Sequence, residues 1–541
     1  MYLNMRLKFI IAAAVLFAAS FGTVSAFDIE KGRVAAFQAQ KGEKASAEFD
    51  KRLSAAEFDL SAKGSKYAKW TLKRIVLKSS EGLAGTVWFH NTRKDIMLVS
   101  APEKTGTVTL DIIGDGKFGQ KERKFFATVY PAALKAGEVE VEYYFADPKG
   151  NVEVAGHKVP VSGTFFSVGD VTVIRDVLPG KNPQASGWTV KPYKTDVDAI
   201  RARVLEIARK AGIASIQLAY QDNLDKVELT VTNDAWFQKN ENRRKYAAEY
   251  TNDNVYQAAA VGALPLVYVL LKMSEDGAID LDKPLFQYDP KFLSHFAKKS
   301  HRKARKLTAR MCLEHISDIS RKEEITVGMP SIKYGESKNN YSVLQWAVEA
   351  ITGKTAEELC QNAIFAPLKM KSTSYKWQDA YTSLAVPGLG GKEVTNKPDW
   401  KERSTDVATC LRTTAPEFGA FLRWVLDGGG LKESTVKYVF GHHVGVAATE
   451  YRRERGNLFR GLGWLVEDNP QFGNVATHFG HNGKWRSFAM VIPERSTSFC
   501  LFINSSCRVN FYDAMMDLFL QPAEPMASFG CGVLYPLENR K

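Results

Sequence analysis

The chain has 541 residues, of which 45% are hydrophobic and 25% are charged, and its formal net charge is +13 at pH 7. These proportions exclude a disordered or collagen-like chain and indicate an ordinary globular protein of two or three domains.

Residues 1–26 have the pattern of a secretory signal peptide. Basic side chains in residues 6–8 precede an apolar run over residues 9–21, and the small residues 24–26 form a cleavage site. The apolar run is too short for an ordinary membrane span. The pattern predicts a secreted or periplasmic protein without a transmembrane span in its mature chain, and an uncleaved anchor is the alternative.

The N-terminal part of the mature chain, residues 27–190, is expected to be a small β-sandwich domain that ends in a linker. Residues 27–65 are polar and predict a partly helical or loose lead-in, and Pro and Gly in residues 179–193 predict the linker. Between them, short runs with alternating apolar residues predict strands. These runs cover residues 70–77, 85–89, 107–113, 124–130, 139–145 and 171–174. This domain shows no catalytic constellation.

The second domain, residues 191–541, begins with a different periodicity. Apolar residues at helical spacing predict a helix over residues 197–208. Two alternating runs, residues 214–220 and 227–232, then predict a β-hairpin with a turn at residues 222–225.

The segment from Ala258 to Met273 is almost wholly apolar apart from Pro265, and it predicts a buried helix that ends at Gly277. An acidic turn follows. This order resembles the penicillin-recognising serine hydrolases, the family of class C β-lactamases, D,D-carboxypeptidases and related esterases. In that family a Ser-x-x-Lys motif opens the central helix, and a turn of this kind closes it.

Further segments resemble the same family in the same order along the chain. They are residues 307–317, 341–354, 364–373, 461–464 and 480–483. The resemblance covers residues 195–520. It implies an α+β, β-lactamase/transpeptidase-like domain with an antiparallel sheet flanked by helices, preceded by the β-sandwich domain.

The catalytic motifs implied by the resemblance are altered. Acyl transfer needs an activated hydroxyl and a base, but Ala260 and Ala263 occupy the Ser-x-x-Lys positions and supply neither. Glu336 and Lys338 occupy the first and third positions of the second motif, Tyr-x-Asn or Ser-x-Asn. We interpret this pair as the salt-bridged rim of a cleft, and a new acid/base pair is the alternative.

The third motif is similar to residues 481–483, and bulky residues that follow it are expected to narrow or cap the pocket. His481 is interpreted as a wall residue rather than a base. The candidate residues of the binding cleft are His481, Asn482, Gly483, Trp485 and Arg486.

Six cysteines are compatible with either buried free thiols or one or two disulfides. Neither a Cys-x-x-Cys pair nor a histidine cluster suggests zinc, so no metal or cofactor is predicted. The cysteines are Cys312, Cys360, Cys410, Cys500, Cys507 and Cys531.

Two dense basic runs account for part of the positive charge. They are interpreted as solvated loops, with contact to an anionic surface as the alternative. In an exported protein that surface would be envelope polymer or lipid headgroup. Nucleic acid is not expected, because export separates the protein from it and no nucleic-acid motif occurs. The runs cover residues 298–306 and 452–455.

Two functions follow from these observations. The first is a catalytically inactive protein with a binding or scaffolding role, whose cleft retains a peptide or small-molecule ligand. The second is an active esterase, amidase or D,D-peptidase with a rewired site. The loss of nucleophile, base and second motif together favours the first function, because these groups act as a unit.

Overall fold

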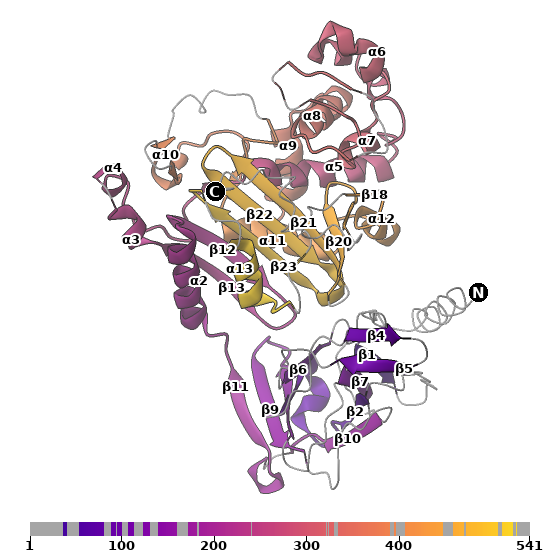
Figure 1. The fold of residues 1–541 in the computed structure, drawn as a ribbon, viewed down its shortest axis with the longest axis vertical. Helices are drawn as coiled ribbons and strands as arrows, with labels where there is room; N and C mark the ends of the chain where they lie inside the picture. The colour runs from indigo at the N-terminus through magenta and orange to yellow at the C-terminus, as the bar shows by residue number, and fades with distance from the viewer. Residues whose placement is uncertain are drawn as a thin grey trace, which may run out of the picture. The chain divides into compact units, whose positions relative to one another are not determined.

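The structure is a computed structural model (Figure 1). It describes residues 36–40, 54–79, 88–92, 95–99, 107–112, 123–129, 139–159, 171–180, 183–239, 241–320, 322, 324–328, 334–389, 394–395, 406–446, 458–469, 472–506, 511–522 and 526. The expected signal peptide, the basic run at 452–455, Cys507 and Cys531 lie outside these residues. The chain divides into two compact units: residues 1–195 with 470–473 and 494–496, and the remainder.

The first unit consists of two main sheets that face each other. Tyr143 of one sheet contacts Phe58 of the other edge-on at 6.5 Å between ring centroids and donates a hydrogen bond to Asp176. This arrangement confirms the expected β-rich domain. One sheet has the order β1(Ala36–Gln40), β7(Arg123–Val129), β2(Ser54–Ser61), β10(Val171–Val177), and the other β11(Thr189–Tyr193), β9(Val152–Lys158), β8(Val139–Ala146), β3(Thr71–Ser79), β6(Thr107–Asp111). A separate pair joins β4(Trp88–Thr92) to β5(Asp95–Val99).

Two expectations for the first unit were wrong. The lead-in contains strands β1 and β2, and β2 buries Ala56, Phe58 and Leu60 on one face. Charged residues between these three positions hide the alternation in an otherwise polar segment. Part of the expected linker is strand β11, which pairs with β9. Residues 85–87 of the expected strand 85–89 lie outside the described residues, and β4 begins at Trp88.

The second unit is built on an eight-stranded sheet with helices on both faces, which confirms the expected α+β fold. The predicted first helix is α2(Val197–Ala211), and the predicted hairpin is β12(Ser215–Gln221) and β13(Lys226–Thr232). The sheet has the order β13, β12, β23(Thr497–Ile503), β22(Trp485–Ile492), β21(Gly473–Asn482), β20(Leu465–Asn469), β19(Leu458–Arg460), β18(Val444–Gly445).

Strand alternation assigns the helices to opposite faces of this sheet. In β23, Cys500 Sγ approaches the carbonyl of Ala415 in α11(Ala415–Leu426), whereas the neighbouring Phe499 packs on Phe519 of α13(Phe511–Phe519). Tyr220 of β12 also packs on Phe519. Helix α13 therefore covers one face together with α2, and α11 covers the other.

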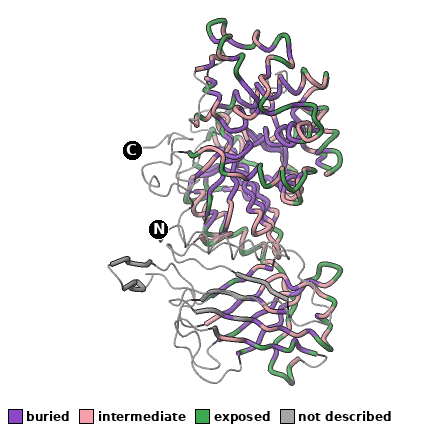
Figure 2. The backbone as a smooth tube through the Cα atoms, turned by 90° about the vertical axis from the view of Figure 1, so that its right-hand side faces the viewer, coloured by how far each residue is buried: buried purple, intermediate pink, exposed green. Residues whose placement is uncertain are grey.

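The central apolar segment forms η3(Ala259–Ala263) and then α5(Leu264–Glu275). The α-helix begins six residues later than expected, and Pro265 lies in its first turn. Backbone N–H groups in the first turn have no partner within the helix, so the N–H that proline lacks costs no hydrogen bond there. Gly277 ends the segment with a φ of 76°, as its position after the helix predicts. The residues from Leu264 to Leu271 are buried, and Figure 2 shows this buried interior in purple.

The remaining helices of the second unit surround the central segment and the sheet. They are α3(Asp234–Phe237), α4(Glu241–Arg244), α6(His301–Ala304), α7(Ala309–Leu313), α8(Asn339–Thr352), α9(Ala356–Cys360), α10(Tyr381–Leu384) and α12(Glu433–Val439). Short strand pairs join β14(Tyr256–Gln257) to β17(Arg412–Thr413) and β15(Gly388–Leu389) to β16(Val394–Thr395). Within the described ranges, no helix has the length and apolarity needed to cross a membrane. Cys312, Cys360, Cys410 and Cys500 are free thiols.

Candidate functional site

The segment at the expected nucleophile position is held in place by its backbone. Tyr256 and Gln257 pair with strand β17, and the backbone N–H of Ala258 donates to the carbonyl of Leu411 at 2.9 Å. Ala259 has a φ of 46°, a left-handed conformation that costs about 1–2 kcal/mol for an L-residue. The surrounding contacts therefore keep a strained turn directly before Ala260.

The third-motif strand lies against this turn. A Cβ atom on Gly480 would lie 2.9 Å from the carbonyl oxygen of Ala258 and 3.0 Å from Cβ of Ala259. The buried hydroxyl of Ser487 donates to the same carbonyl of Ala258 at 2.6 Å. The structure thus brings the expected first and third motifs together, although the two are more than two hundred residues apart.

The two alanines differ in exposure. Ala260 is partly exposed, whereas Ala263 is fully buried. Between them, the carbonyl of Gly262 accepts a hydrogen bond of 2.6 Å from the hydroxyl of Tyr375. Hydrogen bonds hold the backbone around this position, and neither alanine side chain can donate, accept or transfer a proton.

The third-motif residues point to two sides of the hairpin between β21 and β22. Asn482 donates to the side-chain oxygen of Gln257 at 2.7 Å and to the carbonyl of Thr409 at 3.5 Å, so it faces the altered site. His481 and Arg486, which are register partners, instead both approach the carbonyl of Gly483, at 2.9 Å each. Successive side chains of a strand point to opposite faces, which explains why Asn482 and His481 lie on different sides.

Trp485 lies on the same side as Asn482, its register partner, and is buried. Its indole N–H donates to the carbonyl of Val386 at 3.1 Å. A Cβ atom on Gly388 would lie 3.0 Å from the indole ring, so the ring packs directly on the backbone of this segment. The side chain is fixed in position.

The two residues at the second-motif positions, Glu336 and Lys338, differ in exposure and in their contacts. The carboxylate of Glu336 accepts a hydrogen bond from the hydroxyl of Tyr334, and its other oxygen lies 3.4 Å from Nδ1 of the buried His315. Lys338 is exposed, precedes α8 and makes no side-chain cap. The side-chain contacts of Glu336 are therefore with Tyr334 and His315, whereas the expected salt-bridged rim placed Lys338 beside it.

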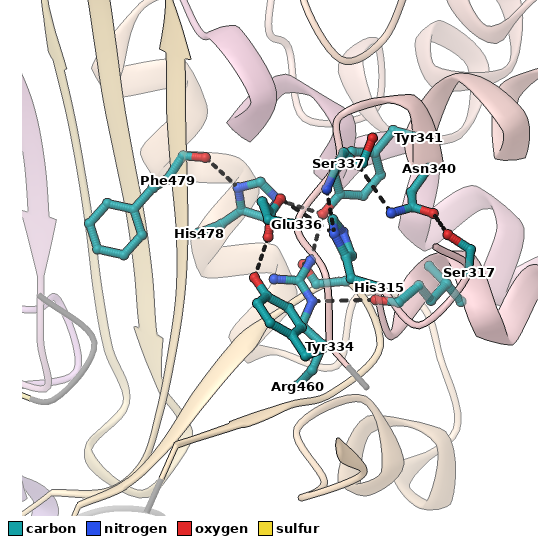
Figure 3. Close-up of polar contacts among 12 residues, drawn as sticks. His315, Ser317, Tyr334, Glu336, Ser337, Asn340, Tyr341, Arg460, His478 and Phe479 are labelled. Carbon is teal, nitrogen blue, oxygen red and sulfur yellow. Dashed lines mark hydrogen bonds and ion pairs between the residues drawn. The ribbon is translucent and has the colours of Figure 1, made fainter. Parts of the chain in front are cut away.

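A buried polar chain that the sequence did not reveal lies beside Glu336 (Figure 3). Arg460 of β19 donates to the hydroxyl oxygen of Tyr341 in α8 at 2.7 Å, and that hydroxyl lies 2.6 Å from Nε2 of His478 in β21. Burial, reinforced by the positive charge of Arg460, lowers the pKa of His478 to about 3. Burial raises the pKa of Tyr341 to about 12. This chain joins two strands and one helix at the site.

The loop before α8 is held by a second set of contacts. Ser317 donates to Asn340 at 2.5 Å, and Asn340 donates to the carbonyl of Ser337 at 3.1 Å. The backbone N–H of Ser337 lies 3.4 Å from Nδ1 of His315. His315 and Ser317 thus have structural contacts. Arg460 directly precedes the segment Gly461–Trp464. Its charge within an otherwise apolar strand is the sequence feature that could have identified it as a site residue.

Among the residues that the structure describes, no group of three or more His, Cys, Asp or Glu side chains is arranged to hold a metal ion.

Comparison with known proteins supports the fold of the second unit. The family model described as Beta-lactamase matches residues 229–514, which is more than half of the chain. A search of curated protein sequences found no match.

Solved structures with a similar fold include a penicillin-binding protein homologue from Pyrococcus abyssi, described as octameric. It is 15% identical with a TM-score of 0.50, over 63% of this chain and 80% of that one. A D-stereospecific amidohydrolase from Streptomyces is 18% identical with a TM-score of 0.46, over 59% and 99%. A D-alanine carboxypeptidase from Burkholderia cenocepacia is 12% identical with a TM-score of 0.47, over 60% and 99%.

Proposed function

Because the chain belongs to the β-lactamase family, whose chemistry requires a nucleophile that this chain lacks, we propose that it is a non-acylating member that binds a peptide or small molecule at the altered site. The single observation that carries the proposal is the partly exposed Ala260 inside an otherwise intact framework. A methyl group cannot attack a carbonyl, and the buried Ala263 cannot act as a base.

The neighbouring polar groups do not replace the missing ones. The hydroxyl of Ser487 contacts the nucleophile segment, but it is fully buried and donates to the carbonyl of Ala258. Glu336, at the position of the second motif's acid/base group, is engaged by Tyr334 and His315. These contacts support the loss of acyl transfer rather than a rewired reaction.

Retained binding is supported by the groups that face the site. The amide pair of Asn482 and Gln257 offers hydrogen-bonding atoms, and Trp485 is a fixed aromatic side chain. Preorganised polar groups with an aromatic neighbour are typical of small-ligand sites.

A labelling experiment tests the inactive site. Purified protein is incubated with a fluorescent penicillin and with a fluorophosphonate and then analysed by intact-mass spectrometry. We expect no covalent adduct with either probe. An adduct on any serine would establish the second candidate, an active hydrolase with a rewired site. As a control, the quadruple variant A260S/A263K/E336Y/K338N restores the family's groups at both motifs and reports whether the framework still admits the probe.

Binding is tested separately by thermal unfolding with muropeptides and β-lactams. A ligand that binds only the folded state stabilises it by about 2.7 kcal/mol at a hundred times its Kd. We expect a rise in Tm with a peptide-like ligand that is reduced in the N482A variant. Equal Tm values with and without every ligand in the panel would argue against retained binding.

We also propose that the protein is exported, on the basis of the signal-peptide pattern in residues 1–26. The full chain is expressed in a bacterium, and the periplasmic and medium fractions are examined by N-terminal sequencing. The expected product begins at Phe27. A product in the cytoplasm that still carries residues 1–26 would contradict export.

A further inference from the structure

The second unit carries a cluster of basic residues, which lies along the chain between the positions of the first and second motifs. We define the basic patch as six residues on η6(Lys298–Ser300), α6 and the turn that follows: Lys298, Lys299, Arg302, Lys303, Arg305 and Lys306. The sequence contains neither Asp nor Glu between residues 290 and 313. Figure 1 shows α6 at the edge of the helical part of this unit, away from the eight-stranded sheet.

The segment is fixed to the protein by its apolar residues, so that its cations point outward. Phe296, Ala304 and Leu307 are buried, and the buried hydroxyl of Ser300 accepts a hydrogen bond of 3.0 Å from the backbone N–H of Val327. All members of the basic patch are exposed except the half-buried Lys303. The backbone that carries the basic patch is therefore fixed to the protein, and the charged side chains lie at the surface.

The charges of the basic patch are not compensated within the protein. Among the described residues none of the six forms an ion pair, whereas exposed lysines on other helices do, as Lys210 with Glu206 and Lys437 with Glu433. Arg305 contacts the ring of Phe286 at 5.2 Å, which leaves its charge unneutralised. The backbone N–H of Ala297 donates to the carbonyl of Ile325, so the segment 324–328 packs beside the patch. Among the described residues of that segment, Glu324 is the one acidic group, and it forms no ion pair with the patch.

The patch concentrates like charges in a short stretch of chain. Its six cations fall within the nine residues 298–306, of which α6 covers only His301–Ala304. Like charges held this close repel one another. A chain with regularly repeated anionic groups can neutralise several of them at once.

Membrane binding and nucleic-acid binding are both less suited to this surface. A short segment that lies in a lipid interface uses apolar side chains that enter it, and here those side chains are buried in the protein. Single-stranded nucleic acid is held by stacking on exposed aromatic rings. Phe292 and Phe296 are buried, and His295 covers the ring of Trp346 at 4.0 Å.

We propose that the basic patch binds a water-soluble linear polyanion whose charged groups repeat along a flexible, base-free backbone. Recognition is electrostatic: the cations of the patch displace counterions condensed on the polymer, and the polymer relieves the repulsion among these cations. This binding is independent of the proposed function of the altered site, so either proposal can fail without the other.

The test measures binding of fluorescein-labelled inorganic polyphosphate to the full chain by fluorescence anisotropy over a series of NaCl concentrations. The patch variant K298Q/K299Q/R302Q/K306Q removes four exposed charges. The matched control K239Q/K354Q/K371Q/K376Q removes four exposed lysine charges elsewhere in the same unit and gives the same net charge. Circular dichroism confirms that both variants fold, and we expect the patch variant to be no less stable than the parent.

We expect the patch variant to lose at least about tenfold in affinity at low salt, with a slope of log Kd against log salt that falls by about three, while the control stays within about twofold. Equal losses in both variants would show that only net charge matters and would overturn the proposal. So would tighter binding of vesicles containing phosphatidylglycerol, or of single-stranded oligo(dT), than of polyphosphate, and so would an absence of polyphosphate binding.

Discussion

The hydroxyl of Tyr341 lies 2.6 Å from Nε2 of His478, and this contact joins helix α8 to strand β21 (Figure 3). Nδ1 of His478 lies 3.1 Å from the carbonyl oxygen of Phe479, which can only accept, so Nδ1 carries the proton. Nε2 is then the acceptor for Tyr341, whose oxygen accepts in turn from Arg460. The result is a one-directional chain of donors that passes through a neutral imidazole and ends on the carbonyl oxygen of Phe479.

Loss of the central hydroxyl in this chain should destabilise the second unit. In Y341F, Arg460 keeps its longer contacts to the carbonyls of Leu313 and Gly463 but loses its shortest acceptor, and His478 loses its donor. Both side chains are buried. Leaving buried polar groups unsatisfied costs about 1–3 kcal/mol each. We expect a decrease of that size in the free energy of unfolding measured with urea.

The control for that experiment is Y438F. Tyr438 is 46% exposed, and its hydroxyl accepts from Arg310 at the surface. We expect a change within about 0.5 kcal/mol, as for most exposed positions. Equal effects of the two substitutions would show that the buried chain contributes no stability of its own.

The neutral state of His478 should make the second unit sensitive to acid. The folded pKa of His478 is about 3, whereas an unperturbed histidine titrates near pH 6.5. Between these values the unfolded chain takes up a proton that the folded chain does not, so the free energy of unfolding falls as the pH falls. In H478Q this proton uptake is absent, and the loss of stability between pH 7.5 and pH 5 should be smaller than in the parent. Parallel pH profiles for the two proteins would contradict this assignment.

The first unit should respond to pH in the opposite direction at His157. Its Nε2 lies 2.8 Å from the carboxylate of Asp176, and both side chains are buried. Burial alone would lower the pKa of His157, but the hydrogen bond and charge of Asp176 outweigh it and raise the pKa. A raised histidine pKa gives stability that is complete below pH 6.5 and is lost as the pH rises through the folded pKa.

The D176N variant tests this sign. It removes the charge that holds the proton on His157, so its destabilisation relative to the parent should be largest below pH 6.5 and should shrink towards pH 9. The measurement is the difference in urea midpoint between parent and variant across that range. A penalty that grows with pH would mean that the imidazole is neutral in the folded unit.

Close approach of β21 to the nucleophile segment should depend on the absence of a side chain at residue 480. A Cβ atom there would lie 2.0 Å from the hydroxyl oxygen of Ser487 and 2.9 Å from the carbonyl oxygen of Ala258. We expect G480A to cost about 1–3 kcal/mol through strain, seen as a lower Tm. In the control G445A nothing lies within 4 Å of the added atom, and we expect a change within about 0.5 kcal/mol. An unchanged Tm for G480A would show that the hairpin shifts at no cost.

The amino-acid sequence was sufficient for the fold of the second unit. The spacing from Ala260 to Gly277 is a property of one continuous segment, and the structure retains it as a 3-10 turn followed by α5. Periodicity also predicted α2 and the hairpin of β12 and β13, because each depends on contacts among residues close in the chain. It failed for β2, where charged residues obscure the buried alternation.

Only the tertiary structure decided which side chains meet. Glu336 pairs with His315 instead of Lys338, because the loop before α8 turns its carboxylate toward the buried side. Asn482 reaches Gln257 across 225 residues of sequence, and Tyr341 reaches His478 across 137. Such partners depend on strand order and register, which arise from the packing of the whole sheet. The alanines at the expected motif positions are therefore evident in the sequence, whereas the contacts around them are evident only in the folded chain.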